Sequence, residues 1–136
     1  MKLASFDIFD TTLIRRCGKP ENIFYILAQK LYPNDKAKRE DFIVWRKRAP
    51  RIVLKKLKKT ELTLHDIYTA EGVVSFNEYD VQTLINKELE TETENLISNP
   101  SIANLINQKR RDGYKIAFIS DMYIDSLTLR KILEKQ

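Results

Sequence analysis

The sequence predicts an α/β fold in which two short buried strands flank a large helical insertion. Residues 2–6 and 114–119 are both apolar and of strand length, and polar residues follow them, at Asp7 and at Ser120. Helical patterns fill most of the chain between these two strands. Ligands of parallel α/β sheets bind just outside the carboxyl ends of the strands. We therefore expect both polar ends to lie at one functional edge.

Six helices are expected between and after the strands, because apolar residues recur there at three- and four-residue spacing. They span 20–32, 36–58, 64–70, 75–97, 102–112 and 126–135. Pro50 lies inside the second helix, where a proline removes one backbone hydrogen bond, so a kink or break is expected near Ala49. Residues 7–19 are expected to form a loop.

Helix starts are predicted from residues whose side-chain oxygen accepts a backbone N–H group of the first turn. The expected caps, in chain order, are Thr63, Ser75 with Glu78 three residues later, Ser101, and Asp125 or Ser126. Gly72 is expected to end the third helix, and Asp112-Gly113 to form the turn before the second strand.

The order of these elements predicts the topology. A right-handed crossover places the two strands parallel and adjacent. The helices between them are too many for one crossover, so we expect an α/β core of residues 1–16 and 100–136 and a helical cap of residues 17–99. A sheet of so few strands has unpaired edges, which predicts self-association or a partner chain that supplies further strands.

Composition excludes several classes of protein. No apolar run approaches the roughly 20 residues that span a bilayer, so no membrane partner is expected. Cys17 is the single cysteine, which excludes an internal disulfide, and together with the absence of a signal peptide this favours the cytoplasm. The single histidine, His65, has no partner at metal-ligand spacing and is expected at the surface.

The net charge of +5 is unevenly distributed. Residues 36–59 contain eleven Lys or Arg against two acids, whereas residues 61–94 contain nine acids against one lysine. The basic residues fall between apolar residues at helical spacing. We therefore interpret them as a solvated helix face beside an acidic neighbour, and nucleic acid is not an expected partner.

The motifs at the two strand ends resemble those of the haloacid dehalogenase (HAD) superfamily. Its first motif is an apolar strand followed by Asp-x-Asp-x-Thr, or a variant without the second Asp, and here it corresponds to Asp7-Ile8-Phe9-Asp10-Thr11. Its second motif is an apolar strand that ends in Ser or Thr, here Ile116 to Ser120. One branch of the superfamily carries a helical cap between these motifs. The resemblance implies an incomplete, HAD-like Rossmannoid core of few parallel strands with a predominantly α-helical cap insertion.

The resemblance also implies an activity, a Mg²⁺-dependent phosphatase acting on a small phosphorylated metabolite. Asp7 would be the nucleophile and form an aspartyl-phosphate that water hydrolyses. Ser120 would donate its hydroxyl to a phosphate oxygen, and Thr11 and Asp121 are the expected substrate-binding residues. Asp7 and the backbone carbonyl of Phe9 would hold Mg²⁺, which offsets the repulsion between carboxylate and phosphate.

Two departures from the family pattern keep alternatives open. Phe9 stands where the phosphatases carry a second Asp, and it cannot provide general acid catalysis, which is typically worth ~10²–10⁴-fold in rate. The third and fourth motifs, a cation and the remaining acidic metal ligands, do not occur before Gln136, so we expect an N-terminal part of a longer protein. The alternatives are a non-enzymatic HAD-like binding module and dehalogenase or phosphonatase chemistry. The sequence does not indicate which substrate is bound.

Overall fold

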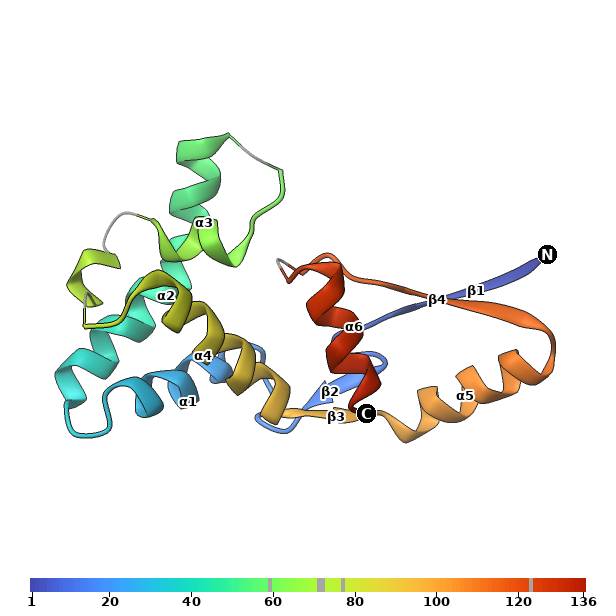
Figure 1. Cartoon of the computed structure of the whole chain (residues 1–136). Coiled ribbons are helices and arrows are strands. Elements are labelled where there is room, and N and C mark those ends of the chain that lie inside the picture. Colours follow the sequence, from blue (N-terminus) through green and yellow to red (C-terminus); the bar gives the residue numbers. More distant parts are fainter. Residues whose placement is uncertain (59, 71–72, 77, 123) are drawn as a thin grey trace.

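The computed structural model shows a mixed α/β structure in which a group of helices is inserted between short strands (Figure 1). It describes residues 1–58, 60–70, 73–76, 78–122 and 124–136. The strands are Lys2–Asp7 (β1), Leu13–Arg15 (β2), Leu96–Ser98 (β3) and Tyr114–Ile119 (β4). The helices are Asn22–Leu31 (α1), Lys36–Leu57 (α2), Leu64–Tyr68 (α3), the 3-10 helix Val73–Phe76 (η1), Val81–Glu94 (α4), Pro100–Arg111 (α5) and Ser126–Glu134 (α6).

Strands β1 and β4 are parallel and adjacent, as predicted. Their register pairs Lys2 with Tyr114 at one end and Asp7 with Ile119 at the other. Gly113 enters β4 at φ +81°, a left-handed conformation that suits glycine and explains the predicted turn at this position. The strands therefore end together, and both carboxyl ends lie at one edge of the sheet.

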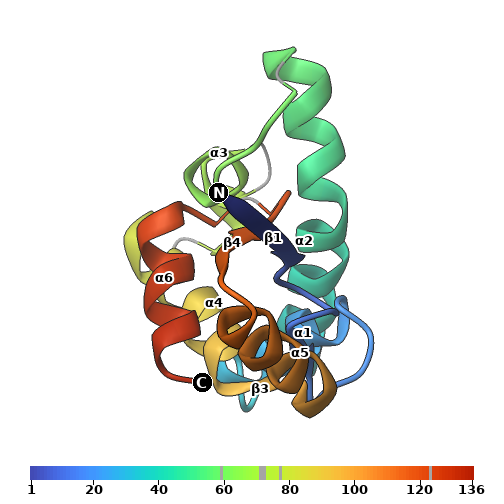
Figure 2. The ribbon, with the colours of Figure 1, turned by 90° about the vertical axis from the view of Figure 1, so that its right-hand side faces the viewer.

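The β1–β4 sheet has one covered and one open face. Helices α5 and α6 lie on the same side of the strands (Figure 2), and Phe6 and Phe118 are directed to that side, where Phe118 packs against a cluster that includes Ile132 of α6. On the opposite face Leu3 and Ile119 are 59% and 60% exposed. Parallel sheets are normally covered on both faces, so this open face is unusual.

Strands β2 and β3 form a short antiparallel ribbon between the two parts of the molecule. Leu13 pairs with Ser98, and the backbone N–H of Arg16 donates to the carbonyl of Asn95 at 2.7 Å just beyond the ribbon. Helices α1 to α4 are thus inserted between two adjacent strands (Figure 1). A loop over 7–19 and a helix continuing to 97 were predicted, and both predictions are wrong in this region. Strands β2 and β3 form there because they pair with each other, and they are too short to show a periodic pattern in the sequence.

The helical group has its own apolar cluster, contributed by α1, α2, α3, η1 and α4. Aromatic side chains form its centre: Phe42 and Phe76 lie edge to face with ring centroids 5.3 Å apart, and Trp45 lies 5.7 Å from Tyr68. A second cluster, separate from the first, includes Ile8 and residues of α6. Within the described residues, no helix combines the length and apolar character needed to cross a bilayer.

The capping residues explain most helix starts. Thr63 accepts from the N–H of Asp66 and completes a capping box, and Asp125 caps α6, both as predicted. The predicted start at Ser75 is wrong, because α4 begins at Val81 with Asp80 as its N-cap. Glu78 is engaged elsewhere, accepting from the Tyr32 hydroxyl and pairing with Lys38.

Two further predictions also need correction. Asn99, and not Ser101, caps α5, since its side-chain oxygen accepts from the N–H of Ser101. A kink or a break was predicted near Ala49, and helix α2 continues through Pro50 without a break, with Ala49 fully buried in the helical cluster. We attribute the continuity to this packing on both turns around the proline. Gly72, the predicted end of α3, lies outside the described residues, and α3 ends at Tyr68.

Candidate functional site

Asp7 and the residue before Ser120 are paired at the carboxyl ends of the two parallel strands. Asp7 is the last residue of β1 and is exposed, and its register partner is Ile119. The backbone N–H of Ile8 donates to the carbonyl of Ile119 at 3.1 Å, which extends the pairing one residue beyond the strand. Ser120 follows directly, so the two residues of the predicted site lie at the same sheet edge, where α/β proteins bind ligands.

The loop after Asp7 is a tight, hydrogen-bonded turn. The Thr11 hydroxyl donates to the Asp7 carboxylate at 3.1 Å, and the Thr12 hydroxyl donates to the Asp7 carbonyl at 2.7 Å. The backbone N–H of Leu13 donates to the carbonyl of Ile8 at 2.8 Å. Asp10 occupies the left-handed region at φ 59°, which costs energy for a non-glycine residue. These bonds determine the orientation of the Asp7 carboxylate.

A buried arginine ties this loop to the helical group. The Arg15 guanidinium donates to Asp10 at 2.8 Å and to Glu92 of α4 at 2.8 Å, and it lies 5.0 Å above the Phe9 ring. The Arg15 side chain is only 2% exposed and that of Glu92 only 8%. Burial alone would lower the pKa of Arg15, but the carboxylates of Glu92 and Asp10 outweigh burial and raise this pKa. For Glu92 burial is the larger effect, and it raises the pKa of this carboxyl group although Arg15 lies beside it. Arg15 thus stabilises the strained Asp10 conformation.

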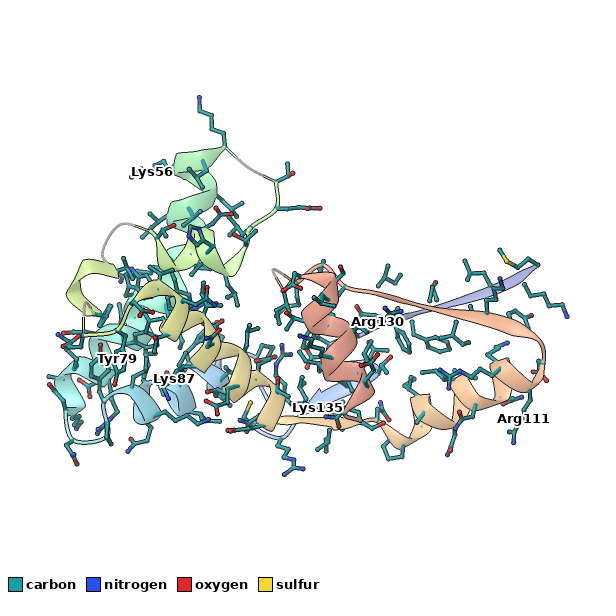
Figure 3. The ribbon with its side chains drawn as sticks, in the orientation of Figure 1. Lys56, Tyr79, Lys87, Arg111, Arg130 and Lys135 are labelled. Carbon is teal, nitrogen blue, oxygen red and sulfur yellow. The ribbon has the colours of Figure 1, made fainter. Side chains whose placement is uncertain are left out.

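Ser120 borders two cavities. Its Oγ accepts from the backbone N–H of Met122 at 3.2 Å, which leaves the hydroxyl hydrogen to be donated to a ligand. A first cavity of about 890 Å³ lies between α5, α6 and the covered face of the sheet, where Arg130 of α6 lines it (Figure 3). A second, of about 810 Å³, lies between the helical group and the segment after β4, and it includes the exposed Asp121.

The metal site that the sequence analysis expected is incomplete. Phe9 is buried beside β2, so its side chain belongs to the core and only its backbone carbonyl can act as a ligand. Among the described residues, no group of three His, Cys, Asp or Glu side chains is arranged to hold a metal ion. Asp10 is bound to Arg15 and not directed to a shared site with Asp7. The described residues therefore do not complete a magnesium site.

Sequence reasoning missed the residues that support the loop. Arg15 and Glu92 are 77 positions apart, and nothing in the local pattern pairs them. Asn99 was not among the predicted caps, yet its side-chain N–H donates to the Thr11 carbonyl at 3.0 Å and its backbone N–H donates to the Thr12 carbonyl at 2.9 Å. The Asn-Pro sequence before a helix is a capping signal that could have identified the first role of Asn99.

Comparisons with known proteins add no assignment. No protein-family model matches the sequence, and a search of curated proteins finds no match. The function is therefore inferred from the residues at the strand ends.

Proposed function

We propose that the chain carries the nucleophile site of a HAD-type hydrolase, a phosphatase that acts on a small phosphorylated metabolite. The observation that supports it is the in-register pairing of β1 and β4, which brings Asp7 and Ser120 to one sheet edge. A solvent-facing turn needs neither a strand-end carboxylate nor a threonine that orients it. The HAD-like identity of the incomplete core, the helical cap and the cytoplasmic location are parts of the same proposal.

The proposed reaction has two steps. A carboxylate oxygen of Asp7 attacks phosphorus, the bond from phosphorus to the leaving oxygen breaks, and an aspartyl-phosphate forms. Water then attacks phosphorus, the bond to Asp7 breaks, and inorganic phosphate leaves. The hydrogen bond from Thr11 to Oδ2 orients the carboxylate for attack by Oδ1, and Ser120 donates to a phosphate oxygen.

Neither residue next to the Asp7 loop provides an evident proton donor for the leaving group. Phe9 cannot transfer a proton, and Asp10 accepts a hydrogen bond from Arg15. Substrates whose leaving group needs little protonation, such as p-nitrophenyl phosphate, are therefore the least affected. Magnesium, which the resemblance implies, enters the proposal as a requirement to be tested.

The test is hydrolysis of p-nitrophenyl phosphate by the wild-type chain, by Asp7→Asn and by Asp41→Asn, each with Mg²⁺ and with EDTA. Asp41 is an exposed acid on α2 and serves as the matched control. We expect Asp7→Asn to fall to the rate measured without protein, while Asp41→Asn retains the wild-type rate. Activity that survives in Asp7→Asn would contradict the nucleophile assignment.

A binding module without catalysis is the second candidate, favoured by the buried Phe9 and by the incomplete metal site. A wild-type chain that is folded by circular dichroism but hydrolyses nothing above background would support this candidate.

The two open edges and the exposed face of the β1–β4 sheet also suit self-association. Analytical ultracentrifugation of the wild-type chain over a range of concentrations measures its oligomeric state.

A further inference from the structure

The second cavity is a cleft that adjoins the proposed phosphate position. It has a volume of about 810 Å³ and is bordered on one side by α2, α4 and residues 60–65. On its other side it is bordered by the segment after β4, beginning with Ser120. The cleft can therefore hold the remainder of a molecule whose phosphate is bound at Ser120. The inference below depends on the proposed function for the position of the phosphate.

The described residues that line the cleft give it a negative charge. Glu61, Asp121 and Asp125 contribute carboxylates, and none of these described residues is Lys or Arg. Hydrogen bonds from Thr128 lower the pKa of Asp125, so this carboxylate is ionised at neutral pH. The whole chain, by contrast, has a net charge of +5. The described lining of the cleft is thus opposite in sign to the net charge of the chain.

The described lysines at the basic end of α2 are not part of the cleft lining. Leu54 lines the cleft, but Lys55, Lys56 and Lys58, which follow it, are exposed and do not line it. Figure 3 shows the Lys56 side chain at the outer end of α2, directed away from α6. His65 also lines the cleft.

Apolar side chains form much of the remaining described wall of the cleft. Leu64 and Ile85 from the helical group and Ile124 from the segment after β4 are each less than 10% exposed. Such a wall accommodates a short carbon skeleton, as small-molecule sites generally do. The cleft therefore combines apolar contact, three carboxylates and a phosphate position at one end.

We infer that the cleft selects phosphate monoesters whose leaving alcohol carries an ammonium group, as in phosphorylated amino alcohols and amino sugars. A cation among carboxylates gains Coulomb energy, whereas a carboxylate or second phosphate at the same place is repelled. The phosphate itself is placed at Ser120, at the sheet edge that also carries Asp7. Substrates with a second anionic group are thus disfavoured by the cleft.

The test measures binding of three unreactive phosphonates by calorimetry: 2-aminoethylphosphonate, ethylphosphonate and phosphonoacetate. We expect the ammonium compound to bind about tenfold more tightly than the neutral one, a difference of about 1.4 kcal/mol, and phosphonoacetate to bind most weakly. The preference should decrease in 0.5 M salt, because exposed charges are screened. Equal affinities, tighter binding of phosphonoacetate, or no binding of any compound would overturn the inference.

Variants assign the preference to the cleft. The double variant Glu61→Gln, Asp121→Asn should reduce the tenfold preference to about threefold or less, since each exposed carboxylate contributes only modestly. Glu90→Gln with Asp41→Asn removes two exposed acids outside the cleft lining and should leave the preference unchanged. Asp125 is retained in both because it caps α6. A preference that persists in the cleft variant contradicts the inference.

Hydrolysis distinguishes this inference from the proposed function. The matched esters are phosphoethanolamine, ethyl phosphate and phosphoglycolate, assayed by release of phosphate. Faster hydrolysis of phosphoethanolamine supports both proposals. Selective binding of the ammonium phosphonate without hydrolysis of any ester contradicts the proposed phosphatase activity but supports the specificity of the cleft. Hydrolysis of all three esters at similar rates supports the phosphatase activity but contradicts the specificity of the cleft.

Discussion

Replacing Arg46 should destabilise the helical group more than any surface change. Its guanidinium donates to both carboxylate oxygens of Glu88, at 2.8 and 2.7 Å, and lies 4.4 Å above the Phe24 ring. The Arg46 and Glu88 side chains are only 1% and 5% exposed. The Tyr68 hydroxyl also donates to Glu88. Arg46→Met keeps most of the apolar stem but leaves the Glu88 carboxylate buried without its counter-ion.

The expected loss follows from this burial. Breaking a buried ion pair by removing one partner typically costs ~3–5 kcal/mol, which is a large share of the ~5–15 kcal/mol that stabilises a domain. With an unfolding entropy of roughly 2.1 cal/mol/K per residue, the melting temperature of a chain of 136 residues should fall by roughly 10–17 °C. An exposed pair would cost under about 1 kcal/mol.

Urea unfolding followed by tryptophan fluorescence measures the loss. Trp45 is the single tryptophan and packs in the helical cluster, so its emission reports on this part of the molecule. The double variant Arg46→Met, Glu88→Leu should recover most of the loss, because it leaves no unpaired charge. Lys47→Met is the matched control, since Lys47 pairs with the exposed Glu21 at 3.5 Å.

Two results would refute the reasoning. One is a loss below about 1 kcal/mol for Arg46→Met, which would equal that of a surface pair. The other is a double variant as unstable as the single one, because the loss would then come from packing and not from the unpaired carboxylate.

Three further predictions concern the loop and the caps. Arg15→Met should lower the free energy of unfolding more at pH 8 than at pH 5, as measured by urea titration. Loss of the arginine further raises the pKa of the buried Glu92. The stability of the variant then falls as the pH rises above about 4.3, the ordinary pKa of a glutamate. Asp125→Ala should cost about 1 kcal/mol at pH 7. Its effect in thermal unfolding should diminish as the pH falls below about 3.9, the ordinary pKa of an aspartate, because the lowered pKa of Asp125 stabilises the fold only while the carboxylate is ionised. Asn99→Ala should cost ~1–2 kcal/mol in urea titrations, since it removes a helix cap and a bond to the Thr11 carbonyl.

Local signals in the sequence were sufficient for the elements that position the candidate site. The apolar runs predicted β1 and β4, and the Asp112-Gly113 turn marked where β4 begins. Capping oxygens at Thr63 and Asp125 identified two helix starts within a residue. Since parallel pairing followed from the crossover rule, the proximity of the ends of the two strands was predictable as well.

Features that depend on tertiary contact were not predictable. Strands β2 and β3 have three residues each and exist because they pair with each other. The Ser75 capping signal failed because Glu78 is used by Lys38 and Tyr32, from distant helices. The link from Arg15 to Glu92 joins residues far apart in sequence and has no local pattern.

The ribbon of β2 and β3 has a consequence for how this protein can change over time. The inserted helices leave the ribbon at Arg16 and return at Asn95, two residues joined by a backbone hydrogen bond. A segment with adjacent ends can be lengthened, shortened or exchanged without moving the strands that flank it, since doubling a loop costs only ~0.6 kcal/mol of closure entropy. Mutations and insertions can therefore change the inserted helices α1 to α4 while Asp7 and Ser120 keep their positions at the strand ends.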